Sequence, residues 1–371
     1  MSTGFQAIQW NRKKIIYDGI LLVAIVVYLS AFILVESRLT PPKNLADVVD
    51  LRVVAFGSCA FFLLSFILCI GPLTRLDRRF LPLLYNRRHL GVVTFCVAAL
   101  HAWYMVDWYL VRDALPSLGR ELTNWVHYHQ FIGFPFKVLG AGALLIMFLM
   151  AATSHDFWLA FLTPRIWKGL HMALYFAYGL VVMHVALGAM QGGGAVIPII
   201  LIVVCGTVVA LHLWAGWREH STDRGSIADS DGWISISRPE EIPDKGARIV
   251  AARGGERIAV FRDGNRIGAL ANLCAHQGGP VGEGRIIDGL VTCPWHGFQY
   301  RLKDGCAPPP FTEKLATYQI RIKEGVVEVD PRQLRPGTQA GIKCSLGTGK
   351  NPDSTTTSER RARSTPPTHE S

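Results

Sequence analysis

Long apolar segments alternate with short charged loops over the first 217 residues of the chain. A helix needs roughly 20 residues to cross the hydrocarbon of a bilayer, and six segments reach that length. They cover residues 15–36, 51–72, 89–111, 132–153, 166–190 and 195–217. The pattern predicts that residues 1–217 form a bundle of six membrane-spanning helices.

Basic residues are concentrated in particular loops of this domain. The 73–88 connection carries five arginines, whereas the 191–194 connection carries no charge. Because cytoplasmic loops of membrane proteins are enriched in Lys and Arg, both chain ends are predicted to face the cytoplasm. The first apolar segment follows basic residues as in a signal peptide, but its length favours a retained span. The expected location is the cytoplasmic (inner) membrane, in contact with lipid.

The net charge of +10 does not point to nucleic acid. The basic residues of the first half lie between apolar segments, and no basic face interleaved with aromatic residues is present. The eight cysteines do not form a disulfide framework either, since four of them lie inside apolar segments. A thiol in such a place behaves as a small hydrophobe, and this usage is compatible with a reducing compartment.

The composition changes after Trp217. Residues 218–230 are polar and are predicted to form a linker, and residues 231–333 alternate short apolar runs with Gly, Pro and Asp. Such alternation is typical of consecutive short strands joined by turns, so an all-β domain is predicted. Residues 334–371 have too little apolar surface to offset the entropy of ordering, so they are predicted to be a disordered tail.

Two short segments of the β domain each offer one thiol and one imidazole. The segments are Cys274-Ala275-His276 and Cys293-Pro294-Trp295-His296-Gly297. Two cysteines and two histidines are the ligand set of a Rieske [2Fe–2S] centre, in which two His replace two Cys on one iron. Mononuclear zinc is the alternative, but zinc fingers place the two Cys together and the two His together.

These motifs, with the glycines around them, resemble the Rieske family over residues 228–330. The resemblance implies four cluster ligands, two on each iron: Cys274 and Cys293, then His276 and His296. High-potential members carry a Cys where this chain has Trp295 and a Ser where it has Phe298. A low-potential centre similar to the ferredoxins of ring-hydroxylating oxygenases is therefore expected, acting in electron transfer alone.

Four histidines lie in or beside two of the predicted spans. His89 and His101 belong to the third span, and His171 and His184 to the fifth. An ionisable residue within a span is a functional-site hypothesis by default. Residues 50–217 resemble the ferric-reductase-like transmembrane family, especially the haem-binding membrane subunit of the bacterial methionine sulfoxide reductase system. That resemblance implies that histidines of these spans ligate haem b.

The spacing of the histidines predicts their depths. His101 lies about 18 Å along its helix from His89, and His184 about 20 Å from His171. Since both spans run in the same direction, His101 and His184 are expected to be level and to share one haem b. His89 and His171 would be level near the cytoplasmic face and would hold a second haem b. The alternative for each is a core histidine bonded to a backbone carbonyl.

The chain has no Rossmann fingerprint, so no NAD or flavin domain of its own is predicted, and electrons must come from a redox partner protein or from quinone. We expect a membrane-bound electron-transfer protein, either an electron carrier or a reductase subunit. It would pass single electrons between the cytoplasmic cluster and haem b, toward an extracytoplasmic acceptor. The alternatives are a quinol-linked module delivering electrons inward and a membrane redox sensor.

Overall fold

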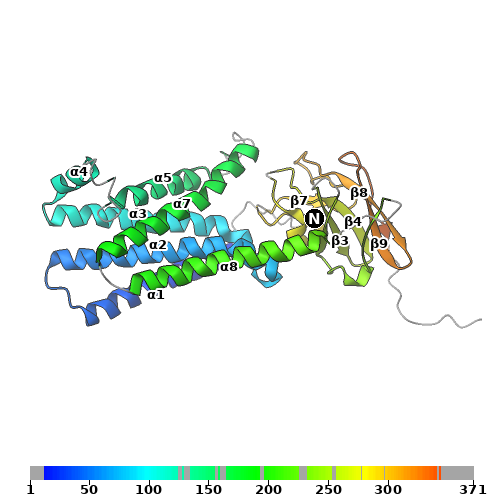
Figure 1. The fold of residues 1–371 in the computed structure, drawn as a ribbon. Coiled ribbons are helices and arrows are strands. Elements are labelled where there is room, and N and C mark those ends of the chain that lie inside the picture. The colour runs from blue at the N-terminus through cyan, green and yellow to red at the C-terminus, as the bar shows by residue number, and fades with distance from the viewer. Residues whose placement is uncertain are drawn as a thin grey trace, which may run out of the picture.

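The chain folds as a helical bundle followed by a β domain. The computed structural model describes residues 12–123, 128, 134–154, 158, 164–192, 196–224, 232–252, 256–276, 278–295, 297–340 and 342–343. Figure 1 shows the long helices running side by side, with the β domain at the end of the bundle where the last helix finishes. The predicted order of the two domains is confirmed.

The bundle is built from long apolar helices. They are α1 (Arg12–Leu39), α2 (Leu45–Leu76), α3 (Leu81–Val111), α4 (Leu115–Thr123), α5 (Lys137–Ala152), α7 (Pro164–Gly192) and α8 (Val196–Arg224). Among the described residues, α1, α2, α3, α7 and α8 are long and apolar enough to cross a membrane. The helix α2 is central, since it packs on α1, α3, α7 and α8.

The fourth predicted span, 132–153, is represented by the shorter helix α5. Its 16 residues extend for about 24 Å at 1.5 Å per residue. The helix begins just after Pro135, because a proline disfavours helical backbone at the residue before it. Large apolar side chains of α1 and α8, such as Ile20, Val23 and Ile202, point outward, as lipid-facing helices require.

The β domain contains two antiparallel sheets. The larger has the order β1-β9-β8-β4-β3-β2, with β10 against β4, and the smaller is β5-β6-β7. The strands are β1 (Ile234–Ser237), β2 (Ala247–Ala251), β3 (Arg257–Asp263), β4 (Arg266–Ala271), β5 (Arg285–Ile287), β6 (Leu290–Thr292), β7 (Gln299–Arg301), β8 (Thr317–Lys323), β9 (Val326–Gln333) and β10 (Ile342–Lys343). The turn of β5 and β6, Asp288-Gly289, has positive φ at both residues, as two-residue hairpins favour.

Ordered structure extends beyond two of the predicted boundaries. The helix α8 continues past Trp217 to Arg224, so the first part of the predicted linker is helical. At the other end, β10 pairs with β4 and the Thr317 hydroxyl donates to the Thr338 carbonyl at 2.8 Å. Hydrogen bonds to the sheet therefore contribute to the order of this part of the predicted tail. Residues 344–371 of the predicted tail lie outside the described residues.

Candidate electron-transfer sites

The two cysteine loops have the same backbone conformation. In each, the Cys N–H donates to a carbonyl five residues on, and the N–H four residues on donates back to the Cys carbonyl. The bonds are Cys274 to Gly279 at 2.8 Å and Gly278 to Cys274 at 2.7 Å, then Cys293 to Phe298 and Gly297 to Cys293, both at 2.8 Å. Gly278 and Gly297 have φ of 69° and 68°, which glycine adopts without steric cost.

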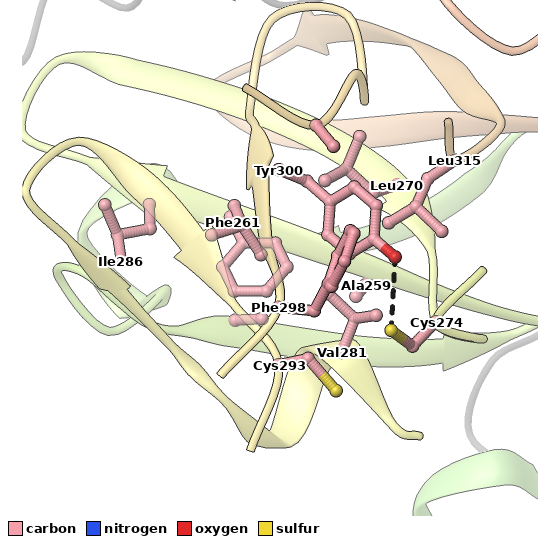
Figure 2. Packing of buried hydrophobic residues seen from close by; sticks show 13 residues of the cluster. Ala259, Phe261, Leu270, Cys274, Val281, Ile286, Cys293, Phe298, Tyr300 and Leu315 are labelled. Carbon is pink, nitrogen blue, oxygen red and sulfur yellow. Dashed lines mark hydrogen bonds between the residues drawn. The ribbon is translucent and has the colours of Figure 1, made fainter. Parts of the chain in front are cut away.

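The two sulfurs are buried at one side of the domain core. Cys274 is 3% exposed and Cys293 1% exposed, and both belong to a cluster with Val281, Phe298 and Tyr300. Figure 2 shows their sulfur atoms at the same edge of this cluster. Two buried thiols on matching loops provide paired sulfur donors, which is the arrangement that a [2Fe–2S] cluster takes from cysteines.

A hydroxyl group lies against one of these sulfurs. Tyr300 is fully buried, and its hydroxyl lies 3.2 Å from Cys274 Sγ (Figure 2). Burial, together with the charge of Cys274, raises the pKa of Tyr300 above its ordinary value, so the hydroxyl keeps its proton and donates. Hydrogen bonds to cluster sulfurs raise the reduction potential. The low potential expected from Trp295 and Phe298 did not take this donor into account.

Of the two loop histidines, the structure describes His276. His276 is partly buried, and its ring stacks on Phe298 with centroids 4.8 Å apart. His296 lies outside the described residues. The described donors, two sulfurs and the His276 imidazole, fit a [2Fe–2S] cluster of the Rieske type, with His296 as the fourth ligand expected from the sequence.

A second site lies inside the bundle, where His101 of α3 and His184 of α7 meet. Their ring centroids are 6.3 Å apart and the rings are nearly perpendicular, at 84°. His101 Nδ1 donates to the Val53 carbonyl of α2, and His184 Nδ1 donates to the Phe136 carbonyl, both at 2.9 Å. Such second bonds leave Nε2 of each ring for a metal. The residues therefore fit a haem with two imidazole ligands.

Each of these rings packs against a glycine of a neighbouring helix. A Cβ at Gly57 of α2 would lie 2.9 Å from the His101 ring, and one at Gly140 of α5 would lie 2.8 Å from the His184 ring. In both halves the bonded carbonyl comes 48 positions before its histidine. The pairs α2–α3 and α5–α7 thus form two similar halves around one site, and neither glycine could be identified without knowing which helices pair.

The other two predicted ligands are not brought together in the same way. His89 Nδ1 lies 2.8 Å from Asp18 Oδ2, so His89 is directed toward α1. His171 lines a cavity beside Arg88 and Met172. In the two similar halves the position that matches His171 is Arg88, because His171 lies thirteen residues before His184 and Arg88 thirteen residues before His101.

The cavity at His171 lies where the bundle meets the β domain, and its volume is about 890 Å³. Its bundle side is formed by apolar residues such as Leu68, Met147 and Met150, with arginines at the edge. Its other side is formed by residues of the two cluster loops, including Ala275 and Trp295. The cavity therefore lies next to the predicted cluster.

Comparison with known families assigns both domains. The family model of the Rieske [2Fe-2S] domain matches residues 232–319, and that of the ferric reductase like transmembrane component matches residues 56–182. The chain joins a ferric-reductase-like membrane domain to a Rieske domain. It is a multi-pass membrane protein with a role in electron transfer, and its Rieske domain supports a [2Fe–2S] cluster.

Relatives of the Rieske domain include ferredoxins that it covers almost completely. The anthranilate 1,2-dioxygenase ferredoxin subunit of Burkholderia cepacia is 41% identical over 102 residues, which are 26% of this chain and 91% of that protein. Ferredoxin CarAc of Metapseudomonas resinovorans is 28% identical over 98 residues, 26% of this chain and 92% of that protein. The solved complex of reduced oxygenase and oxidized ferredoxin in carbazole 1,9a-dioxygenase aligns with a TM-score of 0.26 and 25% identity, covering 28% of this chain and 97% of that chain.

Proposed function

We propose that the protein passes single electrons between a cytoplasmic Rieske cluster and one haem b held by His101 and His184, toward an acceptor outside the cytoplasm. The observation that carries the haem assignment is the facing pair of imidazoles, 6.3 Å apart between centroids. Two imidazole nitrogens about 2.0 Å from a shared metal would put the ring centroids roughly 6 Å apart.

The protein groups around this pair hold the rings ready for a metal. The Val53 and Phe136 carbonyls accept the Nδ1 protons and fix the tautomer, which also makes Nε2 a better donor. Gly57 and Gly140 have no side chain, so the imidazole rings of His101 and His184 can pack against them. When bound, haem supplies one-electron redox chemistry, and the chain contributes ligation, orientation and exclusion of water.

The proposed orientation rests on charge. Arg75, Arg87 and Arg88 lie at the end of the bundle that meets the Rieske domain, where they line the junction cavity. Because arginine-rich loops face the cytoplasm, the Rieske domain is proposed to be cytoplasmic and the membrane to be the inner membrane. The His101 and His184 pair then lies toward the outer side, which suits delivery of electrons outward.

The proposal is for one haem and not two. His171 lies thirteen residues before His184, and the residue of α3 at the same distance before His101 is Arg88, not His89. An arginine has no lone pair to offer a metal. The second haem that the sequence predicts between His89 and His171 is therefore not part of the proposal.

A redox titration of the purified protein in detergent tests the proposal. Visible spectra follow haem and EPR follows the cluster, in the wild type and in His101→Ala and His296→Ala. Each variant should lose one signal and keep the other, and a cluster potential below that of haem would support outward transfer. A cluster potential above that of haem would favour inward delivery from quinol. Absence of haem would remove the membrane half of the proposal.

A further inference from the structure

A cationic side chain of the membrane domain lies against one of the cluster loops. The guanidinium carbon of Arg87, on α3, is 4.9 Å from the centroid of the Trp295 ring. Both residues are partly buried and both line the junction cavity. An arginine over an indole face is an attractive cation–π contact, which strengthens as water is removed.

Trp295 is itself part of the packing between the two cluster loops. It lies between Cys293 and His296 in the sequence and packs against the core cluster that contains both cysteines. A Cβ at Gly279 of the first loop would lie 3.0 Å from the Trp295 ring and 2.9 Å from Cys293 Sγ. A contact that holds Trp295 therefore holds the second loop closed against the first.

The same junction is held by a group of ionic contacts behind the first loop. Arg75 Nε lies 3.1 Å from Glu283 Oε1, and Arg75 Nη1 lies 3.5 Å from Glu219 Oε2. Glu219 also pairs with Arg257 of the Rieske domain. Arg75 thus contacts the segment that follows the first loop, and Arg87 contacts the second loop.

We propose that Arg87 is a positioning and tuning residue for the cluster. Its charge lies within electrostatic range of Cys293, and a positive charge at this partly buried position favours the reduced cluster, which carries one more negative charge. Its stacking on Trp295 keeps the cluster loops turned toward the bundle. The inference rests on the proposed electron transfer and deepens it, because it assigns to the membrane domain a role in setting the potential of the Rieske domain.

The test compares Arg87→Gln, Arg87→Lys and the matched control Arg88→Gln in the full-length protein. EPR-monitored titration should show that Arg87→Gln lowers the ratio of reduced to oxidised cluster at a fixed solution potential about tenfold, a shift of ~59 mV for one electron. Arg87→Lys keeps the charge and should stay within about threefold of wild type. Arg88→Gln should change the ratio by less than Arg87→Gln does.

A second readout separates tuning from positioning. Trp295→Leu removes the aromatic face and keeps the charge of Arg87. It should therefore raise amide hydrogen exchange in residues 290–300 and shift the potential of the cluster less than Arg87→Gln does. If Arg87→Gln does not assemble a cluster, the potential and the hydrogen exchange of Arg87→Lys and Trp295→Leu are compared with those of the wild type.

An Arg87→Gln protein with wild-type potential and wild-type hydrogen exchange would overturn the inference. The EPR signal of the cluster does not depend on haem. A haem-free preparation that still shows the Arg87 effect would therefore contradict only the proposed electron path.

Discussion

Arg75, at the end of α2, donates from Nε to the Glu283 carboxylate over 3.1 Å. Glu283 ends the short helix that follows the first cluster loop (Val281–Glu283), so this bond connects the membrane domain to the cluster region directly. Burial raises the pKa of Glu283, and this effect outweighs the opposite one of Arg75. The docked arrangement therefore raises the pKa of Glu283 even though the ion pair with Arg75 opposes this shift.

This relationship predicts a pH dependence of docking. A carboxyl whose pKa is raised in the docked state contributes most at low pH, and the contribution is lost as the pH rises through that raised pKa. We expect small-angle scattering in detergent to show a more compact protein at pH 5 than at pH 8. Glu283→Gln should remove this difference and Glu240→Gln, at an exposed position, should retain it. A pH response that persists in Glu283→Gln would assign the effect to another group.

A methyl group at Gly140 should disturb the haem site. In Gly140→Ala the new Cβ would lie 2.8 Å from the His184 ring, a distance that real Cβ atoms do not show, so the imidazole must move. We expect loss of most of the bis-imidazole haem spectrum. Gly142→Ala is the matched control on the same helix, because its nearest contact would be an ordinary 3.6 Å to Leu180. Equal haem content in both variants would contradict the assigned site.

Removing the hydroxyl of Tyr300 should lower the potential of the cluster. In Tyr300→Phe, Cys274 loses a hydrogen bond of 3.2 Å, and reduction becomes less favourable because the added negative charge is less stabilised. We expect a negative shift on the order of 59 mV, equivalent to a tenfold change, measured by EPR titration. Tyr318→Phe removes a hydroxyl in the other core cluster and should leave the potential unchanged.

Replacement of His89 should leave the haem content intact. The proposal gives the haem to His101 and His184, and His89 Nδ1 contacts Asp18 of α1, so His89→Ala is expected to keep the full haem to protein ratio in a pyridine haemochrome assay. Its cost should be a loss of stability of about 1–3 kcal/mol, since a partly buried carboxylate is left without its partner. A halved ratio in His89→Ala would instead restore the second haem that the sequence predicts.

Much of the architecture was determined by local sequence. The lengths of the apolar segments predicted the membrane helices, because a bilayer of fixed thickness needs a fixed number of helical residues. The Cys274 and Cys293 motifs predicted the cluster loops, because each loop carries its ligands and its positive-φ glycine within a few residues. Features that depend on neighbours in the chain can be read directly from the chain.

Only the tertiary structure decided which groups face each other. His89 and His101 lie on one helix, but a twelve-residue step turns about 120° beyond whole turns, so one ring meets α7 and the other meets Asp18 of α1. An apolar segment predicts that a membrane helix is present, but it does not specify how that helix is rotated about its own axis. The contacts of Tyr300 with Cys274 and of Arg87 with Trp295 join segments far apart in the chain. They depend on how helices and sheets pack, which no local pattern of residues specifies.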